Sequence, residues 1–209
     1  MNRTSTTGGS SQRTSRYPRL RTGIAILGLI AAVVLAYQAS YWLRIRDLAT
    51  QVPDASALMM LRIDQQPGLD ISYQWVPYER ISPWLRRSVI AAEDTRFMQH
   101  RGIDWEAVQG AAAHNRRAGR IVAGGSTITQ QLSRTLFLSP QRTYLRKAQE
   151  AILALMMAQS LTKRRILELY LNMAEWGDGM FGAEAAALHY FGTPAATLEP
   201  DQAAMLAVR

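Results

Sequence analysis

The sequence predicts a mainly α-helical domain that follows one N-terminal transmembrane helix. Residues 23–43 form an apolar run without a charged side chain, long enough to cross a bilayer. The chain has 209 residues, of which 48% are hydrophobic, and this suffices for a membrane span and one domain of ordinary size. After the span, residues that cap helices precede a series of apolar segments: Ser82, Asp104, Thr127, Thr143 and Thr162.

The positive charge of the chain is concentrated at its N-terminus. The formal net charge is +8, and five arginines before residue 23, unopposed by any acidic residue, supply most of it. A high isoelectric point that comes from a tail is weak support for nucleic-acid binding, so no nucleic-acid partner is predicted. The absence of cysteine excludes disulfides and thiolate metal sites.

The N-terminal third divides into a tail, a span and a connecting segment. Residues 1–22, rich in Ser, Thr, Gly and Arg, are predicted to be a disordered cytoplasmic tail. Residues 23–43 are predicted to form the transmembrane helix, because a cleaved signal peptide would have a shorter apolar run and a clear cleavage site. The arginine excess before the span places the N-terminus in the cytoplasm and the domain outside. Residues 44–82 are predicted to be a stalk and connecting segment, with a short strand within residues 71–76.

Residues 83–209 are predicted to be the catalytic domain, built from a succession of helices. Cap residues and prolines place helices at residues 83–93, 105–117, 183–190 and after Thr127, Thr143, Thr162 and Glu199. The glycine-rich segment 174–182 between two of them is expected to form a tight loop. On the helix after Thr143, the face with Leu145, Ile152 and Leu155 is expected to point inward.

Two adjacent carboxylates, Glu93 and Asp94, stand at the end of the first of these helices. A carboxylate at the mouth of a buried helix lies part-way out of water, where it can accept or donate a proton near neutral pH. Taken alone, a Glu-Asp pair is more often a solvated pair at a helix end. The downstream sequence decides between these interpretations.

The segment from Gly124 to Leu138 predicts an anion site. Thr127 and Gln130 have the spacing of a capping box, and the preceding glycines let the chain approach the helix start closely. Free amide hydrogens, nearby hydroxyls and the positive end of the helix dipole would together attract an anion. Gln131 and Arg134 continue one face of this helix.

A third group combines Arg146, Lys147 and Glu150 on one face of the next helix. The alternative is a purely structural surface ion pair between Arg146 and Glu150, which would stabilise the helix by only a few tenths of a kcal/mol. No phosphate-binding loop, dinucleotide fingerprint or zinc spacing occurs in the chain. His114 and His189 have no partners at metal-ligand spacing, so no metal site is predicted.

Together these segments resemble, in order and spacing, the five motifs of the peptidoglycan glycosyltransferases. The matching segments are E-D-x-x-F-x-x-H-x-G (93–102), G-G-S-T-I-T-Q-Q (124–131), R-K-x-x-E (146–150), K-R-R-I-L-E-L-Y-L-N (163–172) and G-A-E-A-A-A-L-H-Y-F-G (182–192). The flanking Y-Q-W-V-P-Y-E-R-I-S-P and A-E-W-G-D-G-M-F-G resemble the monofunctional biosynthetic transglycosylase branch.

The resemblance implies a lysozyme-like α-helical fold and a single-pass enzyme of the bacterial inner membrane whose domain faces the periplasm. It implies inverting polymerisation of lipid II into β-1,4-linked glycan strands, with release of undecaprenyl pyrophosphate. Glu93 is then expected to be the general base and Glu150 a second catalytic carboxylate. The motifs further imply these contacts to substrate or pyrophosphate: Asp94, Phe97, His100, Ser126, Thr127, Gln130, Gln131, Arg134, Arg142, Arg146, Lys147 and Asn172.

The resemblance names no resident cofactor, and it leaves open a divalent cation at the pyrophosphate and partners among cell-division or elongation proteins. The chain departs from the family pattern at Arg134-Thr135, where Lys-Asn is usual, and at Ala158, where a glutamate is frequent. It also stops within the last motif helix, so apolar faces of the helices at 166–171 and 183–190 are expected to be partly exposed. Two alternatives follow: a peptidoglycan-binding remnant inactivated by C-terminal truncation, and a lysozyme-like hydrolase.

Overall fold

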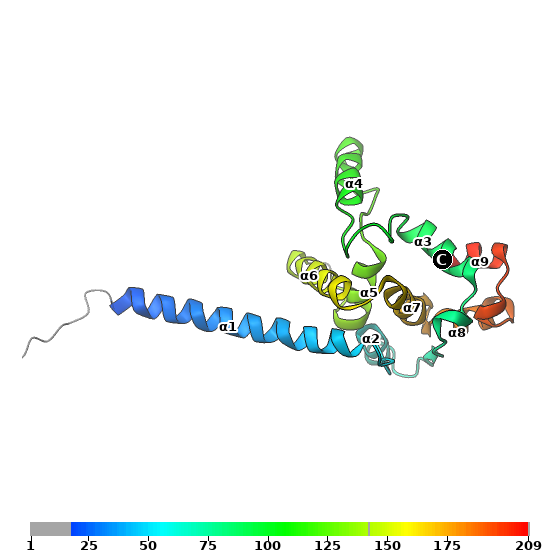
Figure 1. Ribbon diagram of the computed structural model, residues 1–209, viewed down its shortest axis with the longest axis horizontal. Helices are drawn as coiled ribbons and strands as arrows, with labels where there is room; N and C mark the ends of the chain where they lie inside the picture. Colours follow the sequence, from blue (N-terminus) through cyan, green and yellow to red (C-terminus); the bar gives the residue numbers. More distant parts are fainter. Residues whose placement is uncertain (1–17, 142, 209) are drawn as a thin grey trace, which may run out of the picture. The chain divides into compact units, whose positions relative to one another are not determined.

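The computed structural model describes residues 18–141 and 143–208, which form two compact units that meet between Tyr41 and Trp42. The described residues are mainly helical, as predicted (Figure 1). The elements are α1 (Pro18–Asp47), α2 (Ala57–Gln65), β1 (Ser72–Tyr73), η1 (Tyr78–Arg80), α3 (Pro83–Glu93), α4 (Trp105–Ala118), α5 (Ile128–Phe137), α6 (Tyr144–Ser160), α7 (Lys163–Met173), β2 (Glu175–Gly177), β3 (Met180–Phe181), α8 (Ala183–Phe191), η2 (Ala195–Thr197) and α9 (Pro200–Ala207).

Helix α1 is longer at both ends than the predicted span of residues 23–43. Its segment Thr22–Asp47 is long and apolar enough to cross a membrane, with a mean hydropathy of 2.0. The predicted disordered tail is wrong for residues 18–22, which are helical. The helix begins at Pro18, and proline is compatible with the first turn of a helix. Residues 1–17 lie outside the described part of the chain.

The segment predicted to be a stalk packs onto the domain instead. Ile45 and Leu48, just after the predicted span of residues 23–43, are buried. So is Met59 in α2, a helix that was not predicted from the sequence. Arg165 in α7 donates hydrogen bonds to the carbonyl oxygens of Leu48 (2.7 Å) and Gln51 (2.6 Å). Arg165 therefore ties the segment that follows α1 to α7.

Helices α5 and α7 form the centre of the core. Seven of the ten residues of α5 are buried, and α5 packs against both α6 and α7. The buried face of α7 includes Ile166 and Leu171, neither of which is exposed. The predicted partial exposure is therefore wrong for the apolar face of α7. In α8, Ala183, Ala186 and Ala187 are buried but Leu188 is 43% exposed.

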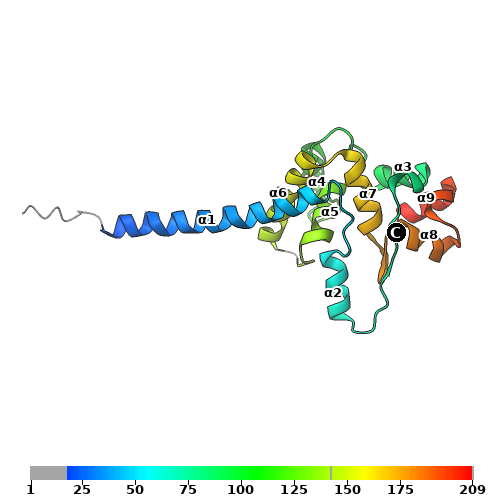
Figure 2. The ribbon, with the colours of Figure 1, turned by 60° about the horizontal axis from the view of Figure 1, so that its bottom comes forward.

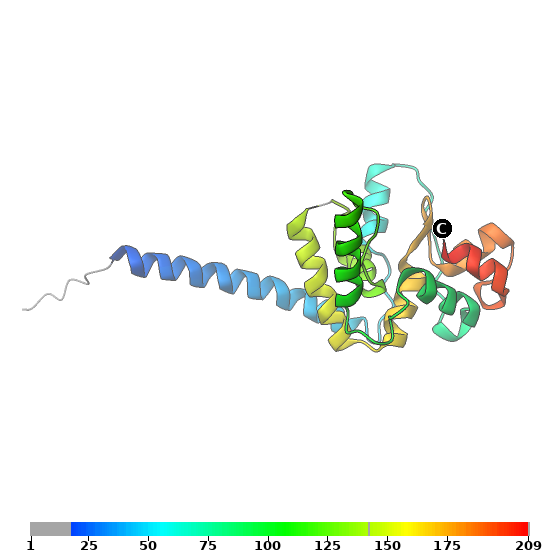
Figure 3. The ribbon, with the colours of Figure 1, turned by 90° about the horizontal axis from the view of Figure 1, so that it is seen from above.

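Helix α9 packs along α3, and the two helices lie side by side in Figures 1 and 3. Leu85 and Val89 of α3 are buried, as are Ala203 and Leu206 of α9. This contact places the C-terminal end of α3, and therefore Glu93, against the last helix of the described chain.

The tight loop predicted before α8 is present as a turn at residues 178–179, and it joins two strands of a small sheet that was not predicted. Strands β2 and β3 are antiparallel, and β1 pairs in parallel with β3 in the order β1-β3-β2. The predicted strand within residues 71–76 is confirmed, although it has only two residues. Figure 2 shows these strands between α2 and α8.

The outward face of α6 corrects a further expectation. Leu145, Ile152 and Leu155 were expected to point inward, but they are 85%, 40% and 38% exposed. Glu150, Leu153 and Met157 of the same helix are buried instead. Helical periodicity identifies a real apolar face, but this face is exposed. Helix α6 packs on α5 with its other face, which also carries Arg146, Lys147 and Glu150.

Asn172 links α7 to the segment before η1, and its removal should destabilise the fold. Its side chain is fully buried, accepts from the Val76 amide (2.9 Å) and donates to the carbonyls of Val76 (3.0 Å) and Glu168 (2.8 Å). We expect Asn172→Ala to cost about 1–3 kcal/mol of unfolding free energy, because buried backbone groups lose their partners. The measurement is thermal or chemical unfolding of the detergent-solubilised protein.

Asn115→Ala is the matched control. Asn115 makes three similar bonds to Val122 and Ala123, but it is only half-buried, so water can replace them. Its loss should cost below about 1 kcal/mol. Equal losses in the two variants would contradict the proposed structural role of Asn172.

Candidate active site

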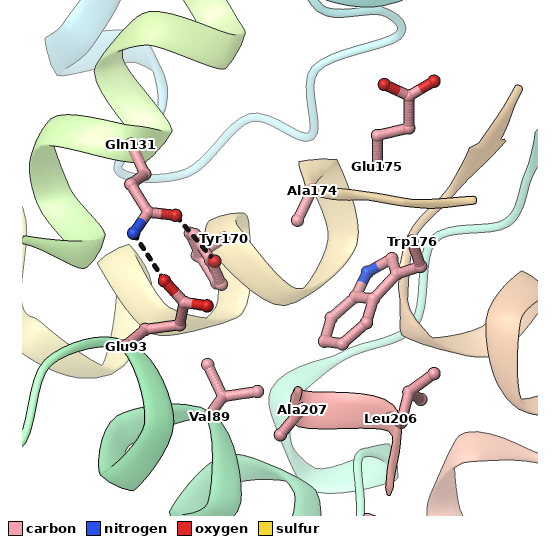
Figure 4. Close-up of a pocket in the computed structure, with 9 residues that line it drawn as sticks. All are labelled: Val89, Glu93, Gln131, Tyr170, Ala174, Glu175, Trp176, Leu206 and Ala207. Carbon is pink, nitrogen blue, oxygen red and sulfur yellow. Dashed lines mark hydrogen bonds between the residues drawn. The ribbon is translucent and has the colours of Figure 1, made fainter. Parts of the chain in front are cut away.

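Glu93 is the last residue of α3, and its carboxylate points into the space between α3, α5 and α7 (Figure 4). The side chain is exposed, so the partial burial expected from the sequence is not observed. Gln131 Nε2 donates to Glu93 Oε2 at 2.6 Å, and the Tyr170 hydroxyl donates to Gln131 Oε1 at 3.0 Å. Three helices therefore contribute to one hydrogen-bonded chain that ends on Glu93.

Two pockets have Glu93 in their walls. The first, of about 180 Å³, lies between α3, α7, β2 and α9. Its polar wall contains Glu175 and Trp176, and Val89, Leu206 and Ala207 form its apolar side (Figure 4). The Trp176 Nε1 donor has no hydrogen-bond partner among the described residues, although the side chain is only 9% exposed.

The second pocket, of about 140 Å³, lies between the end of α3, the start of α4 and the loop before α5. Gly124, Gly125, Ser126 and Thr127 form its loop wall. Gly125 is required here, because a Cβ atom would lie 2.8 Å from the Val108 Cα. Glu93 is shared by both pockets, so a group bound in either one can reach its carboxylate.

Asp94 occupies the N-terminus of α5, which was predicted to be the anion site. Its buried carboxylate accepts from the Ile128 amide at 3.1 Å and contacts His100 Nε2 at 2.9 Å. The capping box of Thr127 and Gln130 is confirmed, and it uses the amides of these two residues. A carboxylate of the protein therefore lies at the helix start where the sequence predicts an external anion, and the binding of an external anion there stays a prediction.

Several residues expected to contact substrate make structural contacts within the domain. Phe97 is fully buried below Lys163, whose ammonium lies 4.3 Å from the ring centroid. Thr127 donates to the Gly102 carbonyl at 2.6 Å, and Asn172 holds the backbone of Val76. Of these side chains and Gln130, only the cap residue Thr127 lines a pocket beside Glu93. Its hydroxyl is already bonded to the Gly102 carbonyl.

Lys163 and His100 complete a buried polar group around Asp94. Burial lowers the pKa of Lys163, and the attraction of Asp94 acts in the opposite direction. Neither Lys163 Nζ nor His100 Nδ1 has a hydrogen-bond partner within the described parts of the chain. This group supports the end of α3 from the side away from solvent.

Glu150 is a buried ion-pair partner, so the alternative of a surface pair is wrong. It is 1% exposed and bonded to both Arg146 and Lys147. Lys147 also donates to the Ser126 hydroxyl at 2.9 Å, which connects α6 to the second pocket. Two cations balanced by one carboxylate leave a net charge of +1 at the edge of this pocket.

Arg134 is exposed on α5 and lies near enough to Tyr170 to affect its ionisation. Burial raises the pKa of Tyr170, the nearby Glu93 raises it further, and Arg134 lowers it. The last predicted cation, Arg142, lies outside the described residues. In the described part of the chain, no group of three or more His, Cys, Asp or Glu side chains could hold a metal ion.

Three residues that line the first pocket were not predicted from the sequence as site residues: Tyr170, Glu175 and Trp176. Tyr170 is only 9% exposed. Its hydroxyl was the available signal, since a buried phenol usually bonds to a specific partner. Glu175 and Trp176 lie on β2, which was not predicted, so no signal placed them beside Glu93.

Comparison with known proteins identifies the family. Residues 63–209 match the family described as Transglycosylase. The chain belongs to this transglycosylase family. It is 50% identical to the biosynthetic peptidoglycan transglycosylase of Azoarcus sp. over 190 residues, which cover 89% of this chain and 82% of that protein. The protein of the same name from Nitrosomonas eutropha is 49% identical over 183 residues (86% of this chain, 75% of the relative). The one from Aromatoleum aromaticum is 47% identical over 193 residues (90% and 84%).

The transglycosylase is therefore a peptidoglycan glycosyltransferase of cell wall synthesis with a lysozyme-like, mainly helical fold. Its N-terminal apolar helix is compatible with a single-pass membrane anchor. The relatives carry a biosynthetic name, which does not support the alternative of a hydrolase. The predicted fold class and enzyme class are confirmed.

The unequal burial of the two cations around Glu150 gives a test of this site. Arg146 has 14% side-chain exposure and Lys147 has 45%. Arg146→Ala should lower the unfolding free energy by about 1–3 kcal/mol, because Glu150 stays buried with one charged partner fewer. Lys147→Ala should cost below about 1 kcal/mol, since water already screens that cation. Chemical unfolding of both variants measures which one loses more unfolding free energy. A larger loss for Lys147→Ala than for Arg146→Ala would contradict this prediction.

Proposed function

We propose that this transglycosylase polymerises lipid II, the undecaprenyl-pyrophosphate-linked disaccharide-pentapeptide, by inverting transfer with Glu93 as the general base. The observation that carries the proposal is the position of Glu93, exposed and shared by two pockets. A transferase must hold a donor sugar and an acceptor sugar on either side of its base, and the two pockets that share Glu93 offer a place for each. Gln131 presents only a neutral donor to the carboxylate, which leaves its charge available for a proton.

In the proposed step, the 4-hydroxyl oxygen of the acceptor sugar forms a bond to the anomeric carbon of the growing chain. The bond from that carbon to the pyrophosphate oxygen breaks, and its electron pair leaves with undecaprenyl pyrophosphate. The hydroxyl proton passes to the Glu93 carboxylate. Attack and departure on opposite faces invert the anomeric centre and produce a β-1,4 linkage.

Cationic side chains are proposed to bind the leaving pyrophosphate, because Asp94 and Thr127 already accept from the Ile128 and Gln130 amides of α5. Lys147 at Ser126 is adjacent to the second pocket, and Arg134 is exposed on α5, near enough to act on Tyr170. Arg146 supports Lys147 through Glu150. Arg142 is assigned to the same role by its motif position alone. A divalent cation would have to be held mainly by the pyrophosphate itself, and its requirement stays a prediction to test.

Glu150 is proposed to position the cations and not to touch the reacting atoms, since its side chain is buried between them. Asp94, His100, Phe97, Thr127, Gln130 and Asn172 are likewise proposed to act by holding the ends of α3 and α5 and the segment before η1. This revises their expected role as substrate contacts. Ser126 remains a candidate contact through its place in the second pocket.

The decisive experiment incubates purified protein with labelled lipid II in detergent. Polymer without added glycan supports the proposal. Binding without product supports the inactive remnant, and cleavage of preformed glycan supports the hydrolase. Omission and replacement of divalent cations in the same assay tests their requirement.

Glu93→Gln keeps the side-chain volume but cannot accept a proton. We expect polymerisation to fall by roughly 10²-fold or more while lipid II binding is largely kept. Glu79→Gln is the matched control, because Glu79 is a 63% exposed surface partner of Arg164 and lines neither pocket. Near wild-type polymerisation by the Glu93→Gln protein would remove the base assignment.

The membrane orientation is also a proposal: N-terminus in the cytoplasm, domain in the periplasm. It rests on five arginines before the span and on Arg44 and Arg46, offset by Asp47, after it. A C-terminal reporter that works only after export should be active, and a reporter that works only in the cytoplasm should be silent. The opposite pair of results would reverse the orientation. Cell-division or elongation proteins as partners remain part of the proposal.

A further inference from the structure

The hydrogen-bonded chain from Tyr170 through Gln131 to Glu93 joins two core helices to an exposed helix end (Figure 4). Tyr170 lies on α7, whose neighbours Leu169 and Leu171 are fully buried. Gln131 lies on α5 between the buried Gln130 and Leu132. The two upstream members are thus fixed by the core, whereas Glu93 is exposed.

Glu93 needs such support because of its place in α3. As the last residue of the helix, its carboxylate lies at the negative end of the helix dipole, where an anion is disfavoured. An exposed glutamate also has several free rotamers, and ordering it costs conformational entropy. Apart from the amide of Gln131, no hydrogen bond or ion pair to the Glu93 carboxylate is found in the described parts of the chain.

The direction of each hydrogen bond determines which end of the Gln131 amide faces the Glu93 carboxylate. Burial raises the pKa of Tyr170, so its phenol stays protonated and donates to Gln131 Oε1. With the carbonyl oxygen of the amide engaged there, the amino group of Gln131 faces Glu93. An amino group can only donate, and it therefore suits an ionised carboxylate.

We propose that Tyr170 is a positioning residue that acts through Gln131 to hold the Glu93 carboxylate in one orientation, in the wall shared by the two pockets. Tyr170 itself need not touch substrate, because its hydroxyl is used by Gln131. Gln131 changes from an expected substrate contact to the link between the core and the base. The inference rests on the proposed role of Glu93 as the general base.

Tyr170→Phe removes the first hydrogen bond and little else. We expect kcat for lipid II polymerisation to fall about 3- to 10-fold, the effect of one lost hydrogen bond, with KM changed by less than about twofold. Tyr73→Phe is the matched control: its hydroxyl donates to the Pro53 carbonyl at 3.2 Å, away from both pockets. That variant should keep wild-type kcat.

A double-mutant cycle separates positioning from a general packing effect. In the Gln131→Leu background the connection to Glu93 is already broken, so adding Tyr170→Phe should lower kcat by less than about twofold further. The full 3- to 10-fold loss in that background would overturn the inference. Melting temperatures of all variants accompany the kinetics.

Gln131→Glu supplies a test that does not depend on the folding of the Tyr170 variant. A carboxylate at this position cannot donate and repels Glu93, so its kcat should be at least about tenfold below that of Gln131→Leu. Equal rates for the two Gln131 variants would also overturn the inference. If Glu93→Gln polymerises normally, the proposed function fails, whereas an inactive Glu93→Gln with a fully active Tyr170→Phe defeats only the positioning role.

Discussion

The buried carboxylate of Asp94 is the contact on which the arrangement of the active site depends. It binds the first amide of α5 and the imidazole of His100 at the point where α3 ends. One anion therefore satisfies the positive end of a core helix and sets the direction in which the chain leaves α3. Glu93, its neighbour in sequence, is brought beside Gln131 of the same α5 helix as a consequence.

The two glutamates of the site have opposite environments, and their chemistry follows from that difference. Glu93 is exposed and has one neutral donor, so it can exchange a proton with a bound hydroxyl. Glu150 is buried and bonded to both Arg146 and Lys147, so its carboxylate is occupied as their counter-ion. In the proposed mechanism, Glu93 therefore takes the proton and Glu150 organises the charge.

The same reasoning explains where an anionic leaving group can bind. A helix start is a common anion site, but at α5 the protein supplies its own anion for the Ile128 amide and caps the Gln130 amide with Thr127. We therefore propose that positive charge for the pyrophosphate comes from flexible side chains such as Lys147 and Arg134. Long cationic side chains can follow a leaving group as it moves, which a fixed helix end cannot do.

Local signals in the sequence determined the helices and their boundaries. Ser82, Asp104, Thr127, Thr143 and Thr162 all cap the helices predicted from them, because a cap acts within three residues of itself. The motif order determined the family, and the charge-free run determined the candidate span. Only the tertiary structure decided which polar atoms remain free: Asp94 uses the α5 amide, Tyr170 meets Gln131, and β2 brings Trp176 to the pocket of Glu93. These contacts join segments 34 and 39 residues apart or more, and such pairings leave no periodic trace in the chain because they depend on how whole helices pack.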